Sequence, residues 1–242
     1  IDHIMITGDL VNHADWEYST SSHIDVIRNL STTVREFFPE TPTFWAIGNH
    51  EGVPVNGLFS HLFIKIKLNK FCFFEVILSL VSIKNWRRSK LNACRRGAFN
   101  VAVVPGLRII SINTGFCIDT NFFLYLNQSD PDSTMTWFAQ QLYNAELAGE
   151  SAHILAHIPP GYDDCLEGWS RNYYRIIQRF AKTVTGQFFG HVHYDYFTVF
   201  FDDMNNVSSE AISVLYAAPS ASTFDYVNPA YRIYALDPEN GF

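Results

Sequence analysis

Gln187-Phe188-Phe189-Gly190-His191-Val192-His193 is the stretch that decides the fold of this 242-residue chain, because an apolar run ends there in a glycine and two histidines. Three other segments repeat the pattern of a strand-like apolar run followed at once by polar residues. They are Gly8-Asp9 after His3–Thr7, Gly48-Asn49-His50-Glu51 after Phe44–Ile47, and His157-Ile158-Pro159-Pro160 after Ile154–Ala156. Open α/β sheets bind ligands at the carboxyl ends of their strands. We therefore expect the four segments to converge on one pocket.

The polar side chains of these segments combine one carboxylate, one amide oxygen and three imidazoles: Asp9, Asn49, His157, His191 and His193. Hard oxygen and borderline nitrogen donors in this mixture suit a pair of divalent ions, with zinc as the first choice. Such a site activates water against phosphate esters. His50 is not needed as a ligand, and near an attacked phosphate it would protonate the leaving alkoxide as a general acid.

Taken singly, each residue also has a structural interpretation. Asp9 would be a turn aspartate, Asn49 a left-handed turn residue, and His157 a structural ring in a stiff proline loop. Only the set favours metal binding. In His191-Val192-His193, alternate positions of an extended segment point to the same side, and Gly190 lets the backbone approach a charged centre. The remaining histidines are interpreted as structural or surface residues: His3, His23, His61 and His153.

Composition sets the broad class of the protein. Hydrophobic residues make up 48% of the chain and charged residues 17%, so a large core is expected and disorder is not. A net charge of −7 argues against a nucleic-acid partner, which needs a basic face. Four cysteines without a Cys-x-x-Cys pair are too few for a disulfide scaffold. Three glycosylation sequons, beginning at Asn29, Asn127 and Asn206, favour the secretory pathway.

Strand-like and helical patterns alternate along the first part of the chain, and a β-rich, antiparallel part follows. We expect helices at Ile24–Phe38, Ser133–Leu147 (capped by Asp132 or Ser133) and Asn172–Ala181. We expect strands at Phe44–Ile47, Leu107–Ile112, Ala152–Ala156 and Gly186–Phe189, and later at Tyr194–Phe201, Ile212–Ala218 and Tyr231–Leu236.

The stretch from Leu58 to Lys90 fits neither pattern. It has no clean helical or strand period, and its apolar part, near Phe71–Ile83, is too short to span a bilayer. We interpret it as an anomalous insertion and expect no transmembrane segment.

Gly8-Asp9, Gly48-Asn49-His50-Glu51 and Gly190-His191-Val192-His193, in this order, resemble the calcineurin-like metallophosphoesterases. Longer matches resemble the acid sphingomyelinase branch of that family: Gly48–Asn56, His157–Gly161, Trp169–Ile176, Gln187–His193, Pro105–Arg108 and Ala218–Ala221. The resemblance covers nearly the whole chain outside Leu58–Lys90. It implies one catalytic domain over residues 1–242, truncated at both ends.

The resemblance implies an α/β four-layer sandwich in which helices flank two central mixed sheets. It also implies two zinc ions bridged by Asp9. Asn49, His157 and His191 complete the ligands of one ion and His193 serves the other, while His50 and His13 donate protons or stabilise the transition state. A Cys117–Cys165 disulfide and an aromatic contact to choline from Phe224 or Tyr226 follow from the same resemblance.

The chain departs from the family pattern in three ways. The upstream strand carrying Asp-x-His is missing, so the first strand and two ligands of the second metal are absent. The saposin-like domain expected in the parent protein is also missing. Thr120 stands where the branch has a glutamate.

By resemblance the protein hydrolyses sphingomyelin, in membranes or lipoproteins, to ceramide and phosphocholine, and is secreted or lysosomal. Two alternatives stay open: an enzyme for nucleotides or other small phosphodiesters, and an inactive metal-binding fragment.

Overall fold

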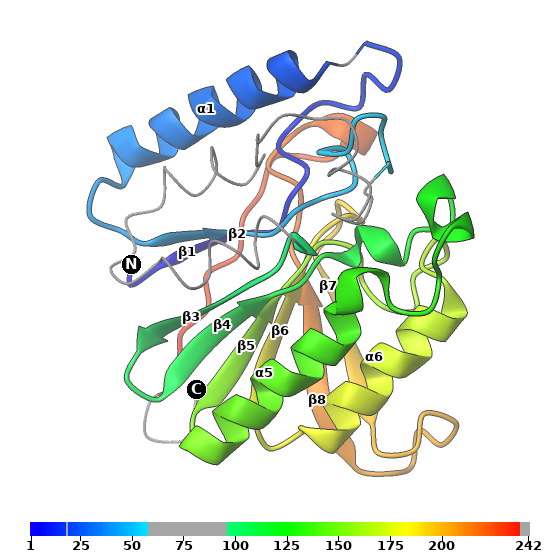
Figure 1. Cartoon of the computed structure of the whole chain (residues 1–242). Helices are drawn as coiled ribbons and strands as arrows, with labels where there is room; N and C mark the ends of the chain where they lie inside the picture. The colour runs from blue at the N-terminus through cyan, green and yellow to red at the C-terminus, as the bar shows by residue number, and fades with distance from the viewer. Residues whose placement is uncertain (18, 58–95, 238–242) are drawn as a thin grey trace.

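The computed structural model describes residues 1–17, 19–57 and 96–237, so the anomalous insertion expected at 58–90 lies outside the described residues. Two sheets pack face to face between helices, which gives a helix–sheet–sheet–helix arrangement (Figure 1). The α/β sandwich expected from the sequence is confirmed.

The smaller sheet pairs β1 (Ile4–Ile6) with β2 (Thr43–Trp45) in parallel. The connecting helix α1 (Thr20–Phe37) covers its outer face and buries Ile27 against Trp45. The helix begins four residues before the predicted Ile24 because Ser19 caps it, accepting a hydrogen bond from the Ser22 amide at 3.1 Å.

The larger sheet has the order β3-β4-β5-β6-β8-β7. Its strands are β3 (Phe99–Val104), β4 (Leu107–Ser111), β5 (Ser151–Leu155), β6 (Val184–Phe189), β7 (Tyr196–Phe201) and β8 (Ala211–Ala217). The four inner strands run parallel, and both edge strands are antiparallel to their neighbours. The sheet is mixed, as expected. Strand β3 was not predicted from the sequence. The second half of the chain was predicted to be antiparallel, but within its described residues only β7 and β8 pair in that way.

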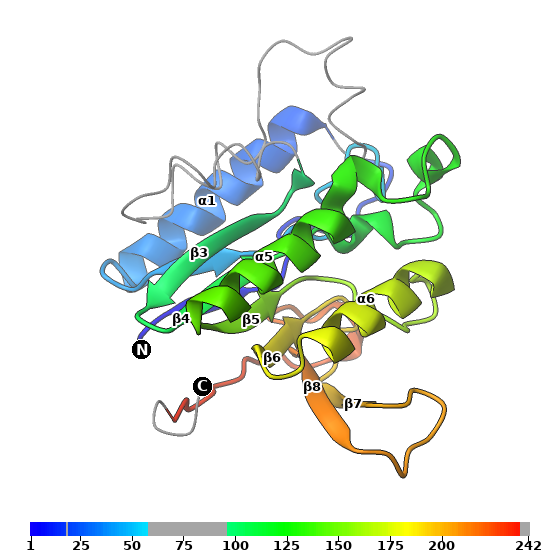
Figure 2. The same cartoon turned by 60° about the horizontal axis from the view of Figure 1, so that its bottom comes forward.

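Helices α5 (Thr134–Ala148) and α6 (Glu167–Arg179) cover the outer face of this sheet (Figures 1 and 2). Phe138 and Tyr173 are fully buried there over Ile154. Ser133 is the N-cap residue of α5, as predicted, but its side chain makes no capping hydrogen bond. The Asp130 carboxylate instead accepts from the amides of Met135 (2.8 Å) and Thr136 (3.1 Å).

The predicted strand at Tyr231–Leu236 is wrong. This segment joins no ladder in the described structure, and most of its side chains are exposed. Tyr234 is the exception: its ring packs between the sheets, 4.9 Å from the ring of Phe188 and 5.4 Å from that of Tyr216. Aromatic packing holds this segment in place of strand pairing.

Short 3₁₀ helices fill the loops at the carboxyl edge of the large sheet. They are η1 (Thr114–Phe116), η2 (Phe122–Tyr125), η3 (Pro131–Ser133) and η4 (Phe224–Tyr226). Within the described ranges, no helix has the length and apolar character needed to cross a bilayer.

His153, on the inner face of β5, is 1% exposed and lies against Phe188, and its Nδ1 has no hydrogen-bond partner among the described residues. Burial, assisted by the nearby His3, lowers the pKa of His153 to about 4. The unfolded chain therefore binds a proton between pH 6.5 and pH 4 that the folded chain does not, so stability present above pH 6.5 is lost as the pH falls.

Between pH 7 and pH 4, His153 should cost the wild-type protein about 3 kcal/mol of unfolding free energy. We predict that replacing His153 with leucine abolishes this loss. Urea unfolding of both proteins at pH 7 and pH 4 measures it. The prediction fails if the stability difference between variant and wild type is the same at both pH values.

Candidate metal centre

The polar residues singled out in the sequence lie where loops leave the carboxyl ends of β1, β2, β5 and β6, and these loops meet beyond the sheets (Figure 1). The β5 and β6 loops are hydrogen-bonded to each other through the Gly190 amide and the His157 carbonyl, at 2.9 Å. The smaller sheet supplies Asp9 and Asn49, and the larger one supplies His157 and His191. The site therefore lies across the interface between the two sheets.

Two glycines permit this close approach. A Cβ on Gly48 would collide with the Asp9 carboxylate, so any other residue would displace that side chain. A Cβ on Gly190 would lie 2.5 Å from Thr7 Oγ1 at the end of β1. The close approach expected of Gly190 is therefore made to the β1 strand end.

Four side chains form the centre of the cluster. His157 Nε2 lies 2.9 Å from Asp9 Oδ2 and 3.0 Å from Asn49 Oδ1. His191 Nδ1 lies 3.1 Å from the same oxygen of Asn49. The side-chain amide nitrogen of Asn49 donates to Asn56 Oδ1 at 2.8 Å. Asn49 and His157 are buried, at 4% and 2% exposure.

The donor set fits a divalent cation. His157 Nδ1 lies 2.7 Å from the Thr7 carbonyl, which only accepts, so Nδ1 carries the proton. In the neutral ring, Nε2 then directs its lone pair at oxygens of Asp9 and Asn49. With that ring neutral, the buried Asp9 Oδ2 has no hydrogen-bond donor within the described part of the chain. Lone pairs that converge in a buried site need a cation between them.

In the metal-free chain, Asp9 and His157 shift each other's pKa. Burial alone would lower the pKa of His157, but the Asp9 carboxylate raises it above its ordinary value. Burial likewise opposes ionisation of Asp9, yet His157 holds the pKa of Asp9 well below its ordinary value. A proton on His157 thus takes the place that a metal ion would otherwise fill.

Glu51 joins the loops of the smaller sheet. Its buried carboxylate accepts hydrogen bonds from the amides of Asp9 (3.0 Å), Leu10 (2.6 Å) and Gly48 (2.5 Å). Burial and the charge of Asp9 raise the pKa of Glu51 to about 7. Sequence reasoning assigned Glu51 no role, although its position directly after Asn49-His50 was the available signal.

A second group of titratable side chains places ligand atoms of His13 and His50 within 4.8 Å of a carboxylate oxygen of Asp9. The His50 amide donates to Asp9 Oδ1 at 2.9 Å, and the two imidazole rings lie 3.9 Å apart. His50 Nδ1 also lies 3.3 Å from Asp15 Oδ1, a contact that sequence reasoning missed. Burial is the main cause that lowers the pKa of both His13 and His50.

His193 lies at the edge of the cluster. Its ring centroid is 5.3 Å from that of His13, and its Nδ1 is 3.7 Å from Asp225 Oδ2. The extended segment expected for His191 and His193 is wrong, because both residues have left-handed backbones with φ of 71° and 64°. The chain turns at each histidine, and this turn aims the two rings at different parts of the site.

The two candidate choline contacts differ in position. Phe224 stacks on His13, with ring centroids 3.9 Å apart and planes 7° apart. Tyr226 is fully exposed. The structure therefore brings Phe224, and not the ring of Tyr226, into contact with the histidine group.

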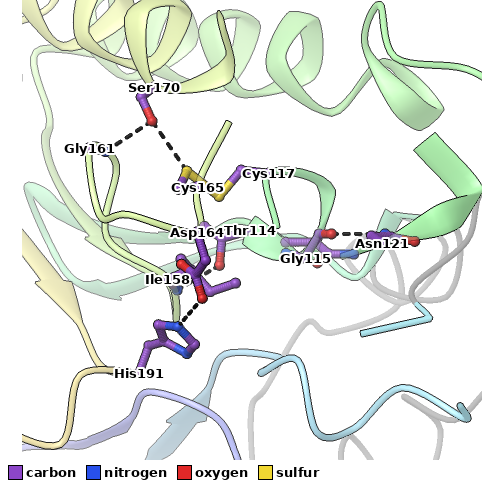
Figure 3. The surroundings of a disulfide bond; sticks show 11 residues. Thr114, Gly115, Cys117, Asn121, Ile158, Gly161, Asp164, Cys165, Ser170 and His191 are labelled. Atoms are coloured by element: carbon purple, nitrogen blue, oxygen red, sulfur yellow. Dashed lines mark hydrogen bonds and ion pairs between the residues drawn. A yellow bond between two sulfur atoms is a disulfide. The ribbon is translucent and has the colours of Figure 1, made fainter. Parts of the chain in front are cut away.

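The Cys117–Cys165 disulfide implied by the resemblance is present (Figure 3). It lies beside Asp164, whose Oδ2 is 2.8 Å from His191 Nε2. Sequence reasoning missed Asp164, for which its place next to Cys165 was the only signal.

Thr120 lies near the site through its hydroxyl, which accepts from Asn56 Nδ2 at 2.9 Å. The sequon asparagines are all exposed: Asn29, Asn127 and Asn206.

Residues 1–195 match the family model for calcineurin-like phosphoesterases. Sphingomyelin phosphodiesterase 1 of Caenorhabditis elegans is 52% identical over all of this chain and 43% of its own length. Human sphingomyelin phosphodiesterase is 37% identical over 98% of this chain and 37% of its own length. A human cyclic GMP-AMP phosphodiesterase is 30% identical over 97% of this chain and 52% of its own length. The chain thus spans about half or less of each of these relatives.

Among solved structures, a dimetal phosphatase from Danio rerio has the same fold. Its TM-score is 0.52 at 12% identity, over 90% of this chain and 72% of that one. The family model covers most of the chain, and sequence relatives match it nearly end to end. The chain belongs to the calcineurin-like phosphoesterase family.

Proposed function

We propose that the protein is a zinc-dependent phosphodiesterase that hydrolyses sphingomyelin to ceramide and phosphocholine. The observation that carries this proposal is the convergence of Asp9, Asn49, His157 and His191 in one buried cluster. The names of the nematode and human relatives support the choice of substrate.

We assign the residues as follows. Asp9, Asn49, His157 and His191 hold one zinc ion, and Asp9 with His193 contributes to a second. When bound, the ions would activate a water molecule and place positive charge beside the phosphate. The upstream Asp-x-His motif expected of the family would complete the second site in the longer protein.

The remaining chemistry falls to the chain's own side chains. His50 protonates the departing ceramide oxygen. The ring centroid of His13 lies 3.9 Å from that of His50, so His13 supports or replaces His50 as the proton donor. The hydrogen bond from the His50 amide to Asp9 fixes the distance between proton donor and metal ligand. Phe224, stacked on His13, offers an aromatic face to the quaternary ammonium of choline, and Tyr226 stands two residues further along.

Nucleotide or other small phosphodiesters are the second candidate substrate class. The 30% identity to a human enzyme named for cyclic GMP-AMP favours this alternative, since the same metal chemistry serves both substrates.

A secreted or lysosomal location is part of the proposal. The Cys117–Cys165 disulfide is typical of oxidising compartments, and all three sequons are accessible for glycosylation. A saposin-like domain in the parent protein would present the membrane or lipoprotein lipid to this site.

Replacing His50 with alanine in the full-length protein should lower turnover of sphingomyelin by about 10²- to 10⁴-fold, because the leaving oxygen loses its acid. Steady-state kinetics measure the effect, and an unchanged zinc content shows that the site is otherwise intact. Near-normal turnover would exclude this role.

Removing metal should lower the thermal unfolding temperature, because a ligand that binds only the folded state stabilises it. Asp9→Asn should bind less zinc and lose most of this chelator sensitivity. Asp25→Asn, an exposed change on α1, is the matched control and should behave as wild type. Scanning calorimetry with and without chelator gives both results. Equal zinc content in wild type and Asp9→Asn contradicts the assignment.

Substrate class is tested by comparing hydrolysis of sphingomyelin vesicles with that of CDP-choline and ATP by the full-length protein. We expect the highest kcat/KM for sphingomyelin. A preference for CDP-choline or ATP would transfer the assignment to the second class. No turnover together with at most one bound zinc would identify an inactive metal-binding protein.

A further inference from the structure

His191 has a polar partner on each ring nitrogen. Nε2 lies 2.8 Å from Asp164 Oδ2, and Nδ1 lies 3.1 Å from Asn49 Oδ1. An ionised carboxylate only accepts hydrogen bonds, so Nε2 carries the proton. The neutral ring then directs its Nδ1 lone pair at the centre of the donor cluster. Asp164 therefore selects the tautomer that metal binding through Nδ1 requires.

Asp164 is itself anchored on both sides by the loop that contains η1. Its carbonyl accepts a hydrogen bond from the Asp119 amide at 2.9 Å. The next residue, Cys165, forms the disulfide with Cys117, and the Leu166 amide donates to the Cys117 carbonyl at 2.7 Å. Both cysteines are buried, so this anchor is shielded from solvent.

The loop that contains η1 and the loop that contains Asp164 each make one further contact with neighbouring segments, and Figure 3 shows both contacts. Ser170 Oγ donates to Cys165 Sγ at 3.2 Å and accepts from the Gly161 amide at 2.9 Å, which joins the disulfide to α6. Thr114 Oγ1 accepts from the Ile158 amide at 2.8 Å, directly after His157. The η1 loop thus contacts the backbone beside one cluster histidine and positions the partner of another.

We propose that Asp164, held by the Cys117–Cys165 disulfide, is a positioning residue that orients His191 for metal binding. The inference rests on the proposed metal site and adds a residue and a covalent link on which its affinity depends. Carboxylates that hydrogen-bond a metal-ligating histidine contribute about 10- to 100-fold to metal affinity.

The test measures zinc affinity of the full-length protein by competition with a chromophoric chelator, and the absorption spectrum of the cobalt-substituted protein. Asp164→Ala should weaken zinc binding by about 10- to 100-fold and change the cobalt spectrum, because His191 loses its fixed tautomer and orientation. Asp164→Asn keeps an acceptor oxygen without the charge and should recover part of the affinity.

Asp163→Ala is the matched control, since Asp163 is the exposed neighbour of Asp164 and should leave both readouts unchanged. Circular dichroism of the metal-free variants confirms that they fold. If wild type binds zinc and Asp164→Ala binds it equally with the same cobalt spectrum, the inference is overturned while the proposed function stands. If wild type binds no zinc, the proposed function itself fails.

The disulfide is tested by the double change Cys117→Ser and Cys165→Ser. We expect it to weaken zinc binding in the wild-type background and to have little further effect once Asp164 is alanine, because both changes act on the same contact. Fully additive effects would show that the disulfide does not act through Asp164.

Discussion

The buried Glu51 carboxylate makes the interaction on which the rest of the site depends. It collects amide hydrogen bonds from the loop after β1 and from the loop after β2, which are separated by about forty residues in sequence. These bonds fix Asp9 against Gly48, and through Gly48 they fix Asn49. Glu51 therefore holds the two ligand-bearing loops of the smaller sheet together, and His157 and His191 contact them from the larger sheet.

Much of this arrangement was predictable because it depends on strand order. A polar residue directly after an apolar run identified four loops, and parallel strands bring the ends of such runs to one edge of a sheet. That reasoning located Asp9, Asn49, His157 and His191, whose side chains the structure does bring together. The inner strands and the two helices of the larger sheet were predictable from hydrophobic period alone. Their ends agree within two residues, except that α6 begins at Glu167, five residues before the predicted Asn172.

The residues that were missed act through contacts that no local pattern reveals. Asp164 matters because a loop distant in sequence brings it to His191, and Asp130 caps α5 from four residues before its first helical residue. The left-handed turns at His191 and His193 also could not be read from spacing, since alternate residues face the same way only in extended chain. Tyr231–Leu236 shows the reverse error: its strand-like pattern corresponds to one partly buried ring, that of Tyr234, and to no ladder within the described residues.

The position of the cluster between two separate sheets has a mechanical consequence. Within the described residues β1 and β2 share no hydrogen-bond ladder with the larger sheet, so the two halves are joined there mainly by apolar packing. An ion held by oxygens from one half and imidazoles from the other would act as a cross-link between them. Loss of that ion would let the two layers separate more easily. The rate at which the core between the sheets opens would then depend on whether the site is occupied, even at positions far from the reacting atoms.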